Sequence, residues 1–501
     1  MTRIKEANAR FEDLLTLAED NYAAANYLAA ARLAQVAAFY AFPASVGLFA
    51  SSRLERLLLD IAKQIPGATD TTAKQTTKRK SRRVLHVLSY AKPIGGDSRY
   101  VWRWMKEDTN SQHSLAITLQ AEVKDNYDIP EIFLTSAEQS GGFVKALGPS
   151  TSNPLELASE LRALCQHADL IALHLYPYDI IPVLALGASC DSVKVIYIHH
   201  SDHTFWVGAS VANSVIHLRK QPLDFLKQRR GLSVDDNPIL PIPIVPLQRA
   251  LPKEEAKSLL GYSEDTVVIL TIASPFKYFA TNQITFLDLV VPVLKQFPQA
   301  VLIAVGPDAK GVWLSANNQT EGRIIALGRR WDNENLYDAA DIYLDSVPCS
   351  SITSTLEAGS HGLPILGYSP SNSEMCLLEP GGAGLDKGML IAKDVASYKE
   401  TLSRLIGDRA FRIQQGHKAQ QEILSMHTGT NWLKAVDQIF HNMGKTKDRL
   451  SINESADTFD QGELDKALTQ LYSQVQGPMH TRQLIGHYIG TLPYHLRLPI
   501  T

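Results

Sequence analysis

A cluster of hydroxyl side chains stands just before a glutamate in the C-terminal half of the sequence. The hydroxyls belong to Ser350, Ser351, Thr353, Ser354 and Thr355, and the glutamate is Glu357. If a helix starts here, its free backbone N–H groups and these hydroxyls can bind a diphosphate without a metal ion. Glu357, about one helical turn further on, can accept hydrogen bonds from a ribose diol. These residue types indicate a nucleotide diphosphate site. A capped helix with a solvated glutamate fits this stretch equally well.

A lysine is predicted at the carboxyl end of a strand further upstream. Residues 266–273 form an apolar, β-prone run, and Lys277 follows it closely. A cation at this position can offset charge on a leaving nucleoside diphosphate, which is the main electrostatic demand of transfer from such a donor. We therefore predict that Lys277 stabilises the transition state. The alternative is an exposed lysine without this role.

Histidines follow two other predicted strands. His174 ends the apolar run at 168–173, where it can hydrogen-bond a sugar hydroxyl or move a proton near neutral pH, or be purely structural. The loop after the strand 193–198 holds His199, His200, Asp202 and His203. Such a loop suggests a metal, but consecutive ligands seldom give tetrahedral geometry, and no distant Cys or His partner is found. Asp202 with one of these histidines is the candidate general base of an inverting enzyme.

The elements that must position these residues alternate between strands and helices. Residues 84–90 predict a strand that leads to Gly95 and Gly96, and residues 100–104 begin a helix. A strand, a glycine loop and a helix in this order let the backbone approach a ligand at the carboxyl edge of a parallel sheet.

The hydroxyl cluster lies between two predicted strands. Residues 341–345 and 364–366 are short apolar runs, and Gly359 and Gly362 end the helix between them. Residues 300–307 and 323–330 predict two further buried strands before this unit. The pattern is that of a βαβ unit, which binds phosphorylated ligands at the start of its helix.

Composition excludes several classes of protein. The chain has 501 residues, which indicates about three domains. A formal net charge of −3 argues against a nucleic-acid-binding protein. The four cysteines have no CxxC spacing, so neither a disulfide scaffold nor a zinc site is expected. The start of the chain lacks a signal-peptide pattern, and no apolar run is long enough for a membrane span. These features predict a cytoplasmic protein.

The run from Leu356 to Ile365 (LEAGSHGLPI) resembles the nucleotide-binding segment of GT-B glycosyltransferases, most of all the retaining family 4. In that family a glutamate at the position of Glu357 holds the ribose of a nucleotide-sugar donor. Residues 341–354 also resemble the matching part of the O-GlcNAc transferases. One departure is Cys349, which stands where family 4 enzymes usually carry another glutamate, so the resemblance supports a nucleotide-sugar site more firmly than a stereochemical outcome.

The resemblance implies an α/β protein of GT-B fold, with two Rossmann-like domains facing a cleft and an N-terminal helical extension. It places Gly95 and Gly96 near the donor phosphates and sugar, His174 opposite the donor sugar, and Arg329 next to the nucleotide base. It also makes the loop with His199, His200 and His203 a contact for the acceptor in the cleft. The expected organisation is a helical extension (1–65), a linker (66–83), an acceptor domain (84–246), a nucleotide-sugar domain (247–440) and a partly helical tail (441–501).

The predicted function is transfer of a sugar from a nucleotide-diphosphate sugar to a glycan, a lipid-linked glycan or a protein, with retention and without a metal or other cofactor. A role in polysaccharide biosynthesis is expected only because many members of the resembled family act there. Two alternatives are an enzyme like the UDP-sugar 2-epimerases and a noncatalytic scaffold that binds nucleotide sugars. No nucleic-acid partner is expected, whereas a peripheral membrane contact and a homo-oligomer formed through the N-terminal helices are left open.

Overall fold

The computed structural model describes residues 2–66, 81–93, 95–120, 127–149, 152–188, 193–220, 222–232, 238–246, 248–278, 284–330, 332–370, 377–443 and 448–472. These residues form two compact units. The N-terminal unit comprises Met1–Leu240 and Val436–Thr501, and the C-terminal unit comprises Pro241–Ala435. Most of the predicted linker lies outside the described residues.

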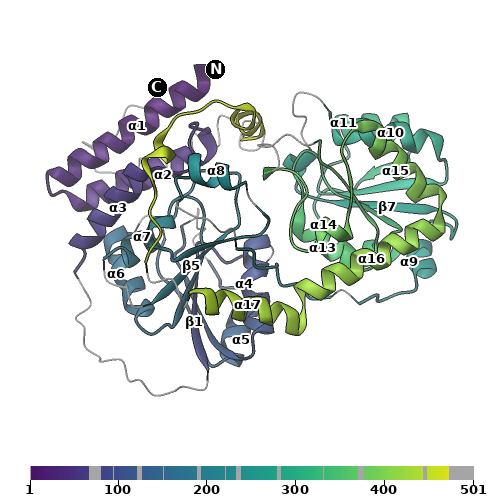
Figure 1. Cartoon of the computed structure of the whole chain (residues 1–501). Helices are drawn as coiled ribbons and strands as arrows, with labels where there is room; N and C mark the ends of the chain where they lie inside the picture. The colour runs from purple at the N-terminus through teal and green to yellow at the C-terminus, as the bar shows by residue number, and fades with distance from the viewer. Residues whose placement is uncertain are drawn as a thin grey trace. The chain divides into compact units, whose positions relative to one another are not determined.

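The N-terminal unit is built on a six-stranded parallel sheet in the order β3-β2-β1-β4-β5-β6. Figure 1 labels β1 and β5 of this sheet. Strands that are buried on both faces of a parallel sheet are expected to be near-continuous apolar runs, and β4 is buried throughout. The strands are β1 (Arg82–Leu88), β2 (Ser111–Ile117), β3 (Val144–Ala146), β4 (Leu170–His174), β5 (Lys194–His199) and β6 (Ser214–His217).

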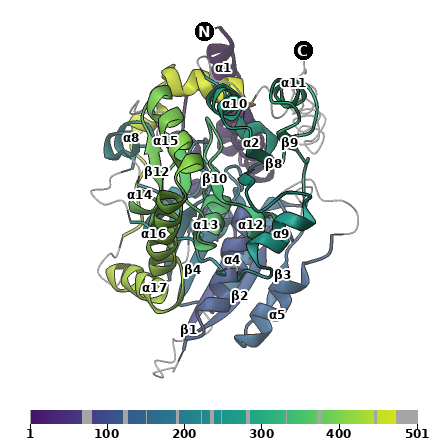
Figure 2. The ribbon, with the colours of Figure 1, turned by 90° about the vertical axis from the view of Figure 1, so that its right-hand side faces the viewer.

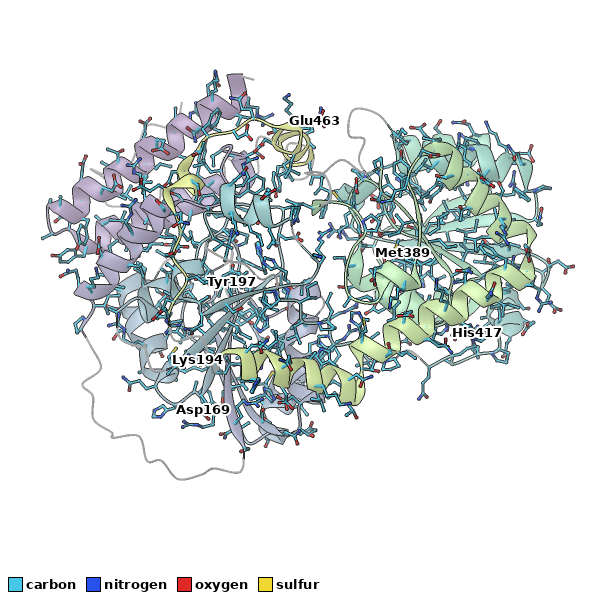
Figure 3. The ribbon with its side chains drawn as sticks, in the orientation of Figure 1. Asp169, Lys194, Tyr197, Met389, His417 and Glu463 are labelled. Atoms are coloured by element: carbon cyan, nitrogen blue, oxygen red, sulfur yellow. The ribbon has the colours of Figure 1, made fainter. Side chains whose placement is uncertain are left out.

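Helices connect these strands, as right-handed parallel crossovers require. They are α4 (Gly96–Glu107), α5 (Glu131–Gln139), α6 (Pro154–Cys165) and α7 (Ile181–Leu186), with a short 3-10 helix η1 (Ala209–Val211) between β5 and β6. The helix α8 (Leu223–Gln228) follows β6. The start of β4 is fixed by Asp169, labelled in Figure 3, whose carboxylate lies 2.8 Å from the Arg83 guanidinium.

The predicted helical extension consists of α1 (Thr2–Ala23), α2 (Tyr27–Ala44) and α3 (Ser52–Gln64). These helices share one hydrophobic core with the sheet of the N-terminal unit. Phe11 of α1 packs edge-on against Phe205, with ring centroids 5.6 Å apart. Glu55 of α3 accepts hydrogen bonds from the Gly208 N–H at 2.6 Å and from the Ser210 hydroxyl. The helices therefore extend the Rossmann-like core instead of forming a core of their own.

The C-terminal unit contains a second six-stranded parallel sheet, in the order β12-β11-β10-β7-β8-β9. Its strands are β7 (Val267–Ile272), β8 (Ala300–Val305), β9 (Ile324–Ala326), β10 (Ile342–Leu344), β11 (Ile365–Tyr368) and β12 (Leu390–Ala392). At β11, Gly367 leaves room for Met389, labelled in Figure 3, because a Cβ at Gly367 would lie 2.1 Å from Cε of Met389.

The helices of the C-terminal unit are α9 (Lys253–Leu259), η2 (Pro275–Tyr278), α10 (Phe286–Gln296), α11 (Val312–Gln319), α12 (Glu334–Ala339), α13 (Ile352–Ser360), α14 (Leu385–Gly388), α15 (Val395–Gly407) and α16 (Arg409–His427). The helix α13 packs against both β10 and α16, and Figure 2 shows it beside α16. Gly359 and Gly416 allow this close packing. A Cβ at Gly359 would lie 2.3 Å from Ile423, and one at Gly416 would lie 2.2 Å from the Gly362 carbonyl oxygen.

The chain then returns to the N-terminal unit through α17 (Gly429–Met443), η4 (Glu454–Asp457) and the helical residues 463–472. The Leu450 N–H donates to the Ala212 carbonyl at 2.8 Å, and Asp457 accepts a 2.7 Å hydrogen bond from the Ser51 hydroxyl. The last residues that the structure describes thus belong to the packing of the N-terminal unit. None of the helices within the described ranges is long and apolar enough to cross a membrane.

Candidate functional site

The hydroxyl cluster lies in the turn between β10 and α13, and a buried carboxylate organises that turn. Oδ1 of Asp345 accepts hydrogen bonds from the N–H groups of Ser346 and Ser351, both at 2.8 Å, and from the Thr355 hydroxyl at 3.2 Å. Burial raises the pKa of Asp345, and the hydrogen bonds it accepts act against that rise. Asp345 therefore holds the turn closed and sets the direction in which α13 starts.

The first turn of α13 presents polar groups of two kinds. No side-chain hydrogen bond from its N-cap residue Ser351 satisfies a backbone N–H of the helix, and the first N–H groups of any α-helix lack acceptors within it. Thr353 and Ser354 are partly exposed, and Ser354 lies 3.4 Å from the Ser351 hydroxyl. Thr355 is wholly buried. Thr353 and Ser354 can thus contact a bound anion, whereas Thr355 supports the turn.

Lys277 lies beside this turn, on η2 at the carboxyl end of β7. Its Nζ donates a hydrogen bond of 2.6 Å to the Ser350 carbonyl oxygen, and its own carbonyl accepts one from the Cys349 N–H at 3.4 Å. The lysine charge also acts on Asp345, since it lowers the pKa that burial raises. Two segments that are distant in the sequence therefore place a cation next to the start of a helix, where an anion is favoured.

Glu357 lies one helical turn after Thr353 on α13 and is 8 % exposed. Its surroundings are tightly packed. The end of α13 is fixed by His361, whose Nε2 lies 2.9 Å from Oδ1 of Asp338, and by Gly359 against α16. Much of the run from Leu356 to Ile365 therefore has a packing role, and Glu357 is the residue in it whose chemistry suits a diol.

Arg329 follows β9 and is exposed. The loops after β8 and β9 are joined by two hydrogen bonds of 2.8 Å, from the Gly306 N–H to the Gly328 carbonyl and from the Gly328 N–H to the Pro307 carbonyl. Gly306 has φ +114°, and a Cβ there would lie 1.8 Å from the Ala273 carbonyl oxygen. This glycine lets the ends of β7 and β8 meet, and it fixes the loop from which Arg329 projects.

In the N-terminal unit, Gly95 is the N-cap of α4 and Gly96 its first residue. A Cβ at Gly95 would lie 2.8 Å from Oδ1 of Asp97, so the loop is tight here. The Ser98 hydroxyl accepts a 3.0 Å hydrogen bond from the Lys92 N–H, which ties the two ends of the loop together. The predicted strand, glycine loop and helix are thus confirmed.

His174, at the end of β4, is the third member of a row of four histidines that crosses the sheet. Its Nε2 lies 3.2 Å from Nδ1 of His86 on β1, and its Nδ1 lies 3.0 Å from Nε2 of His200. Nε2 of His86 lies 3.0 Å from Nδ1 of His113 on β2. His86, His113 and His174 are at most 1 % exposed, and His200 is partly exposed. We call these four residues the histidine row.

His86 and His113 were not among the predicted site residues. The signal that could have found them is a histidine inside an apolar strand, where a buried polar side chain requires a partner. Burial, followed by the neighbouring histidines, lowers the pKa of His174 well below its usual value, and burial together with His113 does the same for His86. Burial lowers the pKa of His200 to about 4.

The other residues of the predicted acceptor loop lie in three different environments. His199 is buried and stacks on Trp206, with ring centroids 4.6 Å apart. Asp202 is bound by the Arg219 guanidinium at 2.5 and 3.0 Å. His203 is partly exposed, and its Nδ1 lies 3.6 Å from Asp202. The loop therefore brings only His200 to the histidine row, and its three histidines do not converge on a common point.

Asp202 is poorly suited to act as a base. Although burial would raise the pKa of Asp202, the Arg219 guanidinium lowers it below its ordinary value. Both carboxylate oxygens already accept hydrogen bonds from Arg219. Within the described ranges, no three His, Cys, Asp or Glu side chains are grouped as metal ligands would be.

No protein-family model matches the chain, and a search of curated proteins finds no match. Solved structures do match. HepE of Anabaena, in complex with UDP and glucose, is 15% identical with a TM-score of 0.53, and the match covers 73% of this chain and 100% of HepE. A glycosyltransferase of Rickettsia africae is 11% identical with a TM-score of 0.54, over 73% of this chain and 100% of that protein.

An O-GlcNAc transferase mutant of Thermobaculum terrenum is 13% identical with a TM-score of 0.50. The match covers 88% of this chain and 82% of that protein. At such low identities the likeness concerns the fold. The prediction of an α/β chain with two Rossmann-like, GT-B-type units is confirmed by the two parallel sheets and by these neighbours.

Proposed function

We propose that this chain is a glycosyltransferase that moves a sugar from a nucleotide-diphosphate sugar to a glycan, a lipid-linked glycan or a protein. The observation that carries the proposal is the position of Lys277, whose ammonium is hydrogen-bonded to the turn that starts α13. A cation and a helix start in one place form a field that favours a diphosphate. Glycosyltransferases of the same fold, one of them in complex with UDP and glucose, support this assignment.

The roles of the residues follow from their places. Lys277 offsets the charge that develops on the leaving diphosphate, and Thr353 and Ser354 donate hydrogen bonds to it together with the first N–H groups of α13. Glu357 accepts hydrogen bonds from the ribose diol, and exposed Arg329 contacts the base. Thr355 acts through Asp345 by holding the turn in shape.

We propose that the N-terminal unit supplies the contacts to the sugar and the acceptor through the Gly95–Gly96 loop, His174, and the loop with His199, His200 and His203. The geometry favours His200 over Asp202 as the residue of that loop that contacts the sugar or the acceptor. Both carboxylate oxygens of Asp202 already accept hydrogen bonds from Arg219. We further propose that the reaction retains the configuration of the anomeric carbon and needs no metal ion. The protein would act in the cytoplasm, in polysaccharide biosynthesis. Retention rests on the likeness of Leu356 to Ile365 to family 4.

The test is a transfer assay with UDP-, GDP- and TDP-sugars, in the presence of EDTA, on pools of glycans, lipid-linked glycans and proteins. The proposal predicts release of the nucleoside diphosphate that depends on an acceptor, and a product whose anomeric configuration, read by NMR, equals that of the donor. Interconversion of the donor sugar without an acceptor would instead identify an epimerase. Donor binding without turnover on any acceptor would identify a scaffold.

A further inference from the structure

The histidine row ends at groups that can only accept hydrogen bonds. Nε2 of His113 lies 3.0 Å from the backbone carbonyl oxygen of Asp108 and 3.5 Å from Oδ2 of its carboxylate. Although burial would raise the pKa of Asp108, its hydrogen bond with His113 lowers it below the ordinary value, so the carboxylate carries no proton. The carbonyl and carboxylate oxygens of Asp108 carry no hydrogen, so in a hydrogen bond between them and Nε2 of His113 the hydrogen must be on Nε2. A neutral imidazole carries one N–H, so Nδ1 of His113 must be the acceptor.

The tautomer of His113 determines the tautomer of each following histidine in the row. Nδ1 of His113 faces Nε2 of His86, which must therefore donate, and Nδ1 of His86 then accepts from Nε2 of His174. In the same way, Nδ1 of His174 accepts from Nε2 of His200. Each contact joins the Nε2 of one ring to the Nδ1 of the next. The direction of the whole row is thus fixed by its first acceptor, the Asp108 carbonyl.

We propose that the histidine row holds Nδ1 of His200 without a proton, as a hydrogen-bond acceptor for a sugar hydroxyl. Within the described part of the chain this atom makes no hydrogen bond, and the His200 side chain is partly exposed, so a ligand can reach it. The tautomer order rests on the distances and on neutral rings, whereas the sugar hydroxyl rests on the proposed function. His113, His86 and His174 are positioning residues that act through His200.

The surroundings of His86, His174 and His200 disfavour a charge on these three rings. The edge of Tyr100, on α4, lies against the His200 ring, with centroids 5.3 Å apart, and Trp104 packs edge-on against His86 at 5.1 Å. The charges that reach the row are carboxylates: Asp97 on α4 near His200, and Asp108 at the far end. Both favour an added proton, and burial opposes it more strongly at His200, whose pKa falls to about 4.

One added proton would reverse the row. If His113 were an imidazolium beside the Asp108 carboxylate, its Nδ1–H would donate to His86, and every later ring would turn from Nε2–H to Nδ1–H. His200 would then present a donor to the ligand in place of an acceptor. Neutral and protonated rows therefore differ in the nitrogen that carries the hydrogen in His86, His174 and His200, and His200 is the ring that would meet the ligand.

The test uses the full chain labelled with ¹⁵N-histidine and two-bond ¹H–¹⁵N correlation spectra at pH 7.5. Signals are assigned by single substitutions, with His417→Gln, an exposed residue of the C-terminal unit, as a control that leaves the row signals unchanged. The expected result is a protonated Nε2 and an unprotonated Nδ1 in all four residues. A protonated Nδ1 at His200 overturns the proposal. The unsubstituted protein gives this result even if a row variant fails to fold.

Three variants test the link to the reaction. His113→Leu removes the anchor, so His200 should show a mixture of both tautomers, and transfer should fall at least tenfold. His200→Phe should lower transfer at least as much, and His200→Asn should restore part of it through its side-chain oxygen. In both His200 variants, the stabilisation by whichever of UDP, GDP, ADP and TDP stabilises the wild type should be unchanged. Full transfer by His200→Phe would contradict the hydroxyl contact. A wild-type protein that no nucleotide stabilises would contradict the proposed function and leave the tautomer order standing.

Discussion

Nζ of Lys277 and the carbonyl oxygen of Ser350 are joined by a 2.6 Å hydrogen bond, so the ammonium is anchored to the turn that leads into α13. The turn is itself fixed by Asp345, which is buried beneath it. A charge held in this way needs little reorganisation when a diphosphate binds or leaves, and such preorganised charge is effective in catalysis.

Lys277→Ala is therefore expected to lower transfer by about 100-fold or more, as the loss of a preorganised electrostatic contact does in other enzymes. The free energy of unfolding should fall by only about 1.5–3 kcal/mol, the range for a hydrogen bond to a charged group. Transfer rates and thermal unfolding measure the two effects. Lys310→Ala is the matched control, because the Lys310 side chain in the same unit is 80% exposed. Full activity of Lys277→Ala would rule out its assigned role.

Glu357→Gln is expected to weaken nucleoside diphosphate binding about tenfold, which corresponds to about 1.4 kcal/mol, because a neutral amide is a weaker acceptor for the ribose diol. Glu357→Ala should abolish transfer. Titration calorimetry with the nucleotide measures the first effect. Glu334→Gln, at an exposed position on α12, should bind like the wild type. Equal affinity of Glu357→Gln and Glu334→Gln would show that Glu357 does not touch the ribose.

Gly306→Ala is expected to destabilise the C-terminal unit by more than about 3 kcal/mol. The φ of +114° alone costs about 1–3 kcal/mol for a residue with a Cβ, and the new methyl would lie 1.8 Å from the Ala273 carbonyl oxygen. Gly311→Ala separates the two contributions. Gly311 has φ +55° and ψ −128°, which is also strained for a residue with a Cβ, but no atom lies within 4 Å of a Cβ there, so it should cost only the conformational part, about 1–3 kcal/mol. Equal effects in chemical denaturation would contradict the close approach of β7 and β8.

Arg219→Met is expected to cost about 3–5 kcal/mol, because it removes the guanidinium that pairs with the buried Asp202 carboxylate. Removing both charges avoids that penalty, so Asp202→Asn combined with Arg219→Met should be more stable than Arg219→Met alone. Thermal unfolding of the single and double variants measures the difference. If the double variant also keeps most of the transfer activity, Asp202 is not the general base. A double variant less stable than the single would refute the buried ion pair.

Acid should destabilise the N-terminal unit well above the pKa of free carboxylates. Burial lowers the pKa of His86, His174, His199 and His217 below their unfolded value of about 6.5. The unfolded chain then binds more protons than the native one, so stability is complete above about pH 6.5 and falls as the pH decreases. Each residue contributes up to about 1.4 kcal/mol per pH unit.

Carboxyls with raised pKa work in the opposite direction. One such carboxyl is Asp179. Burial raises its pKa to about 6, so acid protonates Asp179 more readily in the native state than in the unfolded chain. His199→Phe isolates one histidine, since phenylalanine can keep the stack on Trp206. Between pH 7.5 and 5.5 this variant should lose about 1–2 kcal/mol less stability than the wild type. An unchanged loss would mean that His199 does not titrate on unfolding.

The two sheets were largely predictable from the sequence, because strands that are buried on both faces are read directly as apolar runs such as 266–273 and 300–307. The position of Lys277 after β7 followed from the same pattern. Its hydrogen bond to Ser350 did not, since β7 and β10 become neighbours only through the strand order of the sheet.

The histidine row could not be predicted for a related reason. His86, His113 and His174 lie on three strands, and only the register that pairs Val84 with His113 and Leu88 with His174 brings their rings together. The pairing of Asp202 with Arg219 likewise depends on the path of a loop. Local patterns specify elements, whereas contacts between distant side chains are decided by register and packing.

The most direct test of the central claim is a thermal-shift comparison of the wild type and Lys277→Ala with UDP, GDP, ADP and TDP, all in EDTA. A ligand at 100 times its Kd stabilises a folded protein by about 2.7 kcal/mol, which is readily measured. The account predicts stabilisation of the wild type by one base class, without a metal, and a much smaller shift for Lys277→Ala. If no nucleotide shifts the melting temperature of the wild type, the polar residues at the start of α13 only cap the helix and do not bind a diphosphate. That result would contradict the proposed function.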